Sequence, residues 1–123
     1  EAPILNYTNR TNRRINWIIG LEYNSTLNQI KDLTNHIYNF LLNNPDFTVN
    51  NDYKAFVRLD KFNDSSIDIL IYCFTSTNDW EKFLEIKEIL AMEIKEKVEE
   101  LNLGFAFPSQ SIYIEKDQEY RTE

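Results

Sequence analysis

The sequence predicts one α+β domain, in which two helices cover one face of a mainly antiparallel sheet. Three observations predict this class. Stretches with apolar residues at every second position alternate with two stretches of helical spacing, and a short polar turn joins the middle strands. The chain has 123 residues, a usual length for one domain. Because 42% of the residues are apolar and 14% aromatic, the chain can bury a core and is not expected to be disordered.

The first strand and the first helix are predicted by a change of period. Residues 13–23 alternate, and the residues that share the apolar face are Ile15, Trp17, Ile19, Leu21 and Tyr23. Asn24 or Ser25 is the expected N-cap of a helix over residues 27–41, where apolar residues recur at helical spacing. Pro45 ends this helix because it cannot continue the backbone hydrogen bonds.

The next two strands form a predicted hairpin. Residues 53–62 alternate between apolar and polar side chains, and the polar residues 63–66 form a tight turn. Residues 67–75 are apolar on both faces except at Asp68. A strand of that kind is typical of the centre of a sheet.

A long second helix is predicted over residues 79–102, with a cap formed by Asn78 and Glu81 and a left-handed end at Gly104. A short last strand is expected over residues 110–115. The resulting order is β-α-β-β-α-β, which is the order of the ferredoxin-like sandwich.

The expected organisation has three parts. Residues 1–12 are a linker or the end of a preceding domain, residues 13–116 form the α/β domain, and residues 117–123 form a charged tail. The lack of an initiator Met suggests a longer protein. The first seven residues have neither the basic region nor the apolar core of a signal peptide, and no apolar run is long enough to cross a bilayer.

Charge and cysteine content exclude several classes. The net charge of −7 argues against a surface for nucleic acid or anionic lipid, both of which require clustered Lys and Arg. Cys73 is the one cysteine, so no internal disulfide can form, and its apolar surroundings predict a buried side chain in a protein of a reducing compartment.

The residues for catalysis are scarce, and we predict no enzyme and no cofactor. His36 is the one histidine and is expected to be exposed on the first helix. Two glycines cannot supply a nucleophile elbow or a phosphate-binding loop. The sequence Asp64-Ser65-Ser66 fits turn chemistry, and an enzyme that uses only carboxylates, Asp60 with Asp64 or Asp68, remains an alternative.

No metal site is predicted. One cysteine and one histidine cannot form the paired ligands of a metal carrier. Glu96, Glu99 and Glu100 are expected on the solvated side of the long helix, and Glu93 and Lys97 are expected to form an exposed pair there.

Two binding functions compete with a purely structural one. RNA-recognition modules share the β-α-β-β-α-β order, but residues 66–72 contain no Gly and one aromatic residue. The second alternative is a small-molecule-binding regulatory domain. Such domains usually have Gly in the turn after the first strand, and here residues 23–26 contain none.

Five segments, in order along the chain, resemble the C-terminal region of small-conductance mechanosensitive (MscS-type) channels. They are ILNYTNRTNRR (4–14), IIGLEYNS (18–25), DSSIDI (64–69), TNDW (77–80) and LGFAFPSQ (103–110). The chain departs from the family pattern where Asn24 replaces the commoner Asp and where Phe105-Ala106-Phe107 precedes a single proline, Pro108.

The resemblance implies a cytoplasmic α/β domain on the inner side of a bacterial or archaeal cell membrane. In this family, copies of the protein form a homo-oligomeric ring, typically a heptamer, around a vestibule that filters solutes. Membrane tension opens the pore and releases ions and small solutes on hypo-osmotic shock. The resemblance also implies that the last strand joins neighbouring subunits, and the expected interface residues are Phe107, Pro108, Gln110, Ile112, Tyr113 and Ile114. The acidic charge is expected to favour cations near the vestibule portals.

Overall fold

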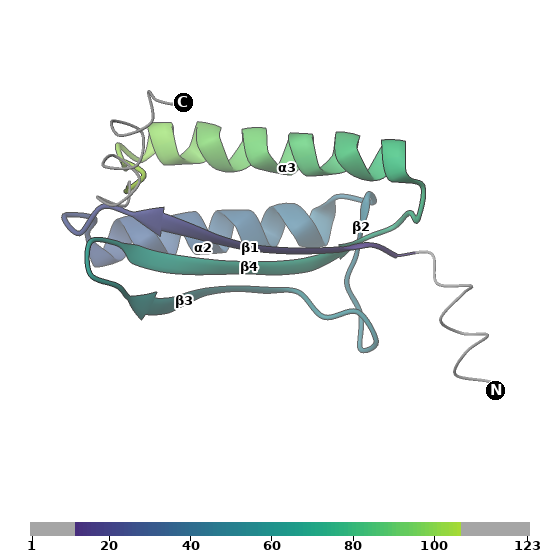
Figure 1. Cartoon of the computed structure of the whole chain (residues 1–123), viewed down its shortest axis with the longest axis horizontal. Coiled ribbons are helices and arrows are strands. Elements are labelled where there is room, and N and C mark those ends of the chain that lie inside the picture. Colours follow the sequence, from purple (N-terminus) through teal and green to yellow (C-terminus); the bar gives the residue numbers. More distant parts are fainter. Residues whose placement is uncertain (1–11, 107–123) are drawn as a thin grey trace, which may run out of the picture.

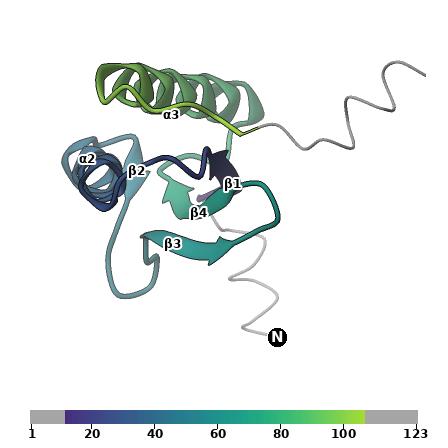
Figure 2. The same ribbon diagram turned by 90° about the vertical axis from the view of Figure 1, so that its left-hand side faces the viewer.

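The structure is a computed structural model that describes residues 12–106. Its elements are β1 (Arg14–Leu21), α2 (Leu27–Asn43), β2 (Phe47–Thr48), β3 (Phe56–Phe62), β4 (Ile67–Thr75) and α3 (Trp80–Glu100) (Figure 1). The strands form one antiparallel sheet, and both helices lie on the same side of it (Figure 2). The predicted α+β class is confirmed. The predicted last strand, residues 110–115, lies outside the described residues.

Strand β4 is the centre of the sheet, as its two apolar faces predicted. β1 pairs with it along its whole length, from Arg14 opposite Phe74 to Leu21 opposite Ile67. β3 pairs along the other edge of β4 with an irregularity between Leu59 and Lys61, and β2 continues that edge. The two-residue strand β2 was not predicted, and β3 begins at Phe56 rather than at residue 53.

The core lies between the sheet and the two helices. Alternate residues of β4 face the helices, and Ile69, Ile71 and Cys73 are fully buried. α2 contributes Ile30, Leu33, Ile37 and Leu41, and α3 contributes Phe83, Ile86, Leu90, Ile94 and Val98. These residues form one hydrophobic cluster, so the described part of the chain has a single core. Two residues assigned to apolar faces from periodicity, Tyr23 and Leu27, are exposed.

The N-cap residues of both helices differ from the predicted ones by one or two positions. α2 is capped by Thr26, not by Asn24 or Ser25. The Thr26 hydroxyl accepts a hydrogen bond from the Gln29 backbone N–H (3.2 Å), and the Gln29 amide oxygen accepts one from the Thr26 N–H (2.8 Å). This reciprocal pair is a capping box. α3 is capped by Asp79, not by Asn78.

The C-terminal end of α3 is left-handed at Asn102, not at Gly104. Asn102 has φ of 60°, and neither glycine has a positive φ. The Leu103 N–H donates to the Val98 carbonyl (2.9 Å) and the Asn102 N–H to the Glu99 carbonyl (3.1 Å). This is the Schellman arrangement, and Asn tolerates its left-handed position better than most residues.

Candidate functional site

All six residues of the expected subunit interface lie outside the described residues: Phe107, Pro108, Gln110, Ile112, Tyr113 and Ile114. The approach to them is described. Phe105 forms a bridge to Leu21, and two hydrogen bonds flank it, from Glu22 N–H to the Gly104 carbonyl (3.0 Å) and from Ala106 N–H to the Gly20 carbonyl (2.9 Å). Residues 104–106 therefore lie along the edge of β1 that faces away from β4.

Gly104 leaves space for a neighbouring side chain and does not supply a left-handed backbone. A Cβ atom at Gly104 would lie 2.5 Å from a carboxylate oxygen of Glu22. The absent side chain thus makes room for the Glu22 carboxylate beside the segment that follows α3.

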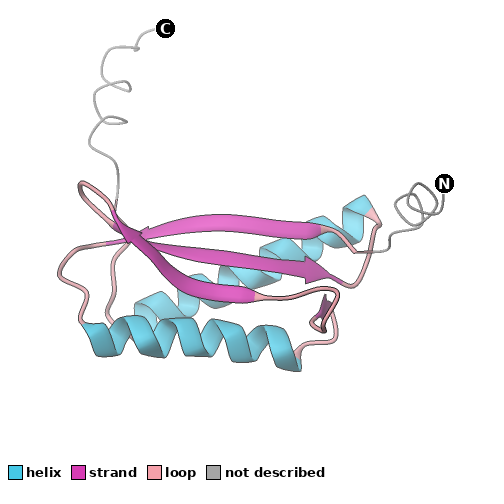
Figure 3. Ribbon diagram, turned by 90° about the horizontal axis from the view of Figure 1, so that it is seen from below, coloured by secondary structure: helices cyan, strands magenta, loops and turns pink. Residues whose placement is uncertain are grey.

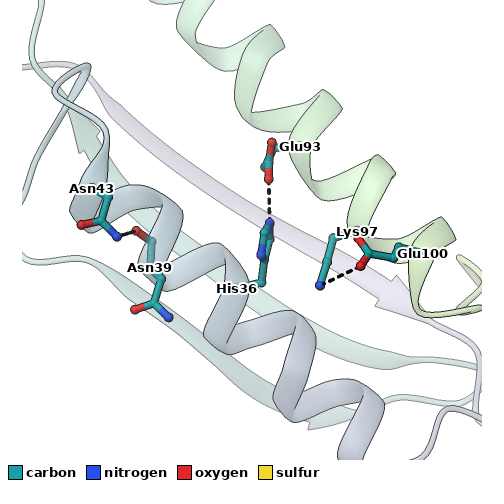
Figure 4. A network of polar contacts seen from close by, with 6 residues as sticks. All are labelled: His36, Asn39, Asn43, Glu93, Lys97 and Glu100. Carbon is teal, nitrogen blue, oxygen red and sulfur yellow. Dashed lines mark hydrogen bonds and ion pairs between the residues drawn. The ribbon is translucent and has the colours of Figure 1, made fainter.

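His36 links the two helices instead of standing exposed in solvent. Its Nε2 atom lies 2.6 Å from a carboxylate oxygen of Glu93 on α3 (Figure 4). Both side chains are about one-third exposed, at 34% and 28%. The expected Glu93–Lys97 pair is wrong, because Glu93 faces α2 and Lys97 pairs with Glu100 at 3.4 Å. This contact is suited to fixing α2 against α3.

The other candidate catalytic groups also have structural roles. Burial raises the pKa of the Cys73 thiol to about 12, which leaves it protonated and unreactive near neutral pH. Asp68 is buried, and its carboxylate accepts hydrogen bonds from Ser66 Oγ (2.8 Å) and Asn63 Nδ2 (3.2 Å). The carboxylate most shielded from solvent in the hairpin is therefore used to hold the turn.

Within residues 12–106 no group of three or more His, Cys, Asp or Glu side chains could hold a metal ion. Glu96, Glu99 and Glu100 are exposed, as predicted. The same part of the chain contains no helix that is both long enough and apolar enough to cross a membrane.

Sequence reasoning missed an aromatic cluster on the open face of the sheet. Tyr72 and Phe74 of β4 pack edge to face, with ring centroids 5.6 Å apart. Phe56 lies 5.9 Å from Tyr72, and Tyr53 lies 5.1 Å from Phe74. The sequence did contain a signal for this cluster. The strand at residues 67–75 is apolar on both faces, and because both helices cover the same face of the sheet, its other apolar face is left uncovered.

Comparison with known proteins decides the family. The sequence profile of the domain described as "Mechanosensitive ion channel MscS, C-terminal" matches residues 15–105. The chain belongs to the MscS family. It is 39% identical over 111 residues to an MscS family protein of Aquifex aeolicus, covering 90% of this chain and 30% of the relative. It is 32% identical over 105 residues to the low conductance mechanosensitive channel YnaI of Escherichia coli, covering 85% and 30%.

Solved structures of MscS-type channels share the fold. MSL1 of Arabidopsis thaliana matches with a TM-score of 0.69 at 15% identity, covering 82% of this chain and 36% of that one. Helicobacter pylori MscS in its closed state matches with a TM-score of 0.62 at 18% identity, covering 80% and 36%. The MscS domain described here thus spans about a third of the length of the proteins that it matches.

Proposed function

We propose that this MscS domain is the cytoplasmic vestibule wall of a tension-gated channel that releases ions and small solutes on hypo-osmotic shock. The observation that carries the proposal is the match of the family profile to residues 15–105, which includes nearly the whole folded domain. In the proposal, copies of the chain form a homo-oligomeric ring, a heptamer by family analogy, on the inner side of a bacterial or archaeal cell membrane. The pore itself belongs to other parts of the protein.

The geometry of the domain supports a wall rather than a catalyst. Its one cysteine is buried and protonated, its one histidine joins the helices, and Asp68 is held within its own hairpin. A wall requires a stable core, surfaces for neighbours and a polar exterior. We therefore propose that the protein is not an enzyme and uses no cofactor.

The acidic surface has a proposed role in ion permeation. The net charge of −7 is repeated in every subunit of a ring, which raises the local concentration of cations near the portals. Neutralising exposed acids such as Glu22, Asp32 and Asp52 is expected to shift the reversal potential in a salt gradient toward lower cation preference. An unchanged reversal potential would refute this part of the proposal.

Osmotic downshock tests the proposed function. The full-length protein is produced in a bacterial strain without its own mechanosensitive channels, and survival is counted after transfer to dilute medium. Expected survival is high for the full-length protein and for Asn35→Asp, which places a charge on an exposed position of α2. It is low for Leu33→Asp, because Leu33 is fully buried and an unpaired charge there disrupts the core. Failure of the unaltered protein to protect cells, although it is present in the membrane, would contradict the proposal.

A small-molecule-binding regulatory domain is the second candidate, and one observation favours it. A hollow of about 560 Å³ lies between α2 and the segment that enters β3, and its lining includes Tyr38, Lys54 and Arg58. The turn after β1, in contrast, is closed internally, because Ser25 donates from both its N–H and its hydroxyl to the Glu22 carbonyl. A screen of small anions by thermal unfolding tests this candidate, since a ligand of the folded state raises the melting temperature.

A further inference from the structure

Two surfaces on opposite sides of the domain have complementary charge and no partner among the described residues. The first is the open face of the sheet, which faces away from the helices. Figure 3 shows the strands in front of α3 when the domain is seen from below. The second is the outer side of α3, which faces away from the sheet.

The open face of the sheet is apolar and basic. Residues that stand opposite one another in the register share a face, so Ile18, Leu70 and Arg58 lie together, as do Phe56 and Tyr72. Ile18 is 54% exposed and Phe56 39%.

Three cations lie on this open face: Arg14, Arg58 and Lys61. The Arg14 guanidinium lies 5.7 Å from the Tyr72 ring centroid. Arg58 and Lys61 have no ion-pair partner within residues 12–106. Two acidic residues lie beside these cations: Asp60, which is exposed at the irregularity of β3, and Asp68, whose carboxylate is buried and hydrogen-bonded to Ser66 and Asn63.

The outer side of α3 is acidic around an apolar centre. Met92 is 60% exposed and lies opposite the buried stripe of the helix. Acidic residues at three- and four-residue spacing share this side, and they are Glu81, Glu85, Glu88, Glu96 and Glu99. Lys82 and Lys95 pair with Glu85 and Glu99, which leaves Glu81, Glu88 and Glu96 without an ion-pair partner in the described part of the chain. A shallow groove runs along this side, and its lining residues are Glu88, Ala91, Met92, Lys95, Glu96 and Glu99.

From these surfaces we infer that the outer side of α3 in one copy docks on the open sheet face of the next copy. The occupant is a second copy of this chain, because the charges are opposite and the dimensions agree. The stripe from Glu81 to Glu99 is about 27 Å long at the rise of an α-helix. The nine residues of β4 span about 27 Å at the rise of a strand.

The contact is heterologous, since it joins two different surfaces, and such contacts build rings when the rotation between copies closes. The inference rests on the proposed function, in that it assigns the surfaces through which the ring is formed. A contact of one helix on one small sheet is small by the standard of stable complexes. It is therefore expected to form between subunits already held in one assembly, where the effective concentration is high.

Cross-linking of the full-length protein in its membrane tests the inference. Ile18→Cys and Met92→Cys are introduced together in a background without other exposed cysteines, and a bifunctional maleimide is added. Native Cys73 stays in place because it is buried and its pKa is raised to about 12. The double variant is expected to give a ladder of linked subunits, and each single variant none. The matched control pairs Ile18→Cys with Asn39→Cys, an exposed position on α2, and is expected to give no ladder.

Charge reversal provides the second measurement on the same cysteine pair. Reversing Arg14 and Arg58 to Glu is expected to lower the cross-link yield several-fold, and adding Glu88→Lys with Glu96→Lys is expected to restore it. Restoration distinguishes the proposed contact from damage to the fold.

Three results would overturn the inference. The first is no ladder in the double variant. The second is a linked dimer with Ile18→Cys alone, which would show that sheet faces meet each other. The third is RNA that copurifies and protects Ile18→Cys, which would show that the aromatic face binds nucleic acid. Tension-activated currents of the same variants are recorded in parallel. Normal currents without a ladder refute the docking surfaces alone, whereas no currents from the unaltered protein refute the proposed function.

Discussion

Replacing Leu90 by Ala is expected to lower the free energy of unfolding of the domain by about 3–4 kcal/mol. Leu90 is fully buried in the middle of α3, against the sheet. The substitution removes three carbon atoms, which accounts for about 2.4 kcal/mol at about 0.8 kcal/mol for each buried group. The cavity that remains adds about 1 kcal/mol, because core side chains relax only in part.

Urea unfolding followed by circular dichroism measures this loss. With a slope of about 1–3 kcal/mol per molar urea, the midpoint falls by roughly 1–4 M. The matched control is Ile89→Ala on the same helix, where the side chain is 47% exposed. Its expected loss is below about 1 kcal/mol, because partly exposed surface contributes less. Equal losses for the two variants would show that α3 is not packed against the sheet through Leu90, and the described core would be wrong.

Three other predictions concern a helix end, the contact between the helices, and the buried thiol. Asn102→Ala is expected to lower the free energy of unfolding by about 1 kcal/mol, because Ala disfavours the left-handed backbone. Gly104→Ala displaces only the flexible end of Glu22 and is expected to lower it by under about 0.5 kcal/mol. Equal losses in urea unfolding would contradict the assignment of Asn102 as the left-handed residue. A double-mutant cycle of His36→Ala and Glu93→Ala is expected to give a coupling energy of about 0.5–1 kcal/mol, and additive effects would mean that the side chains do not interact. Because the Cys73 pKa is raised from 9.0 to about 12, the stabilisation by the protonated thiol is complete below pH 9 and is lost as the pH rises toward 12, by about 1.4 kcal/mol per pH unit. Cys73→Ala is expected to remove this part of the fall in unfolding free energy with pH. An identical fall in both proteins between pH 9 and 12 would refute the prediction.

The parts of the fold that depend on long periodic patterns could be predicted from the sequence. The bounds predicted for the strand at residues 67–75 agree with β4, and the central place of β4 follows from its two apolar faces. The two-residue strand β2 could not be predicted, because a strand that short has no period. It forms only where Phe47 lies opposite Thr75 in the folded sheet.

Helix ends were harder to predict because several adjacent residues can cap. Asn24, Ser25 and Thr26 all have a suitable oxygen. The Ser25 hydroxyl donates to the Glu22 carbonyl instead, and the Thr26 hydroxyl is the one that pairs with Gln29. Choices of this kind depend on the path of the chain before the helix, which the local sequence does not show.

For the candidate site, sequence reasoning was limited where contacts join distant segments. The expected pairing of Glu93 with Lys97 followed the spacing on one helix, yet Glu93 meets His36, which is 57 residues away in the chain. The same limit explains the missed open face. Tyr53, Phe56 and Tyr72 come together only when β3 and the segment before it lie beside β4. The six interface residues proposed in residues 107–114 remain a prediction.

Recording currents under membrane tension tests the central claim most directly. The full-length protein is purified, reconstituted in liposomes and studied in patches under graded suction. The account predicts channels that are closed at rest and open in steps as tension rises, with openings lost in Leu33→Asp and kept in Asn35→Asp. Protein that is inserted and folded but stays silent up to the tension that ruptures the patch would contradict the assignment of this domain to a tension-gated channel.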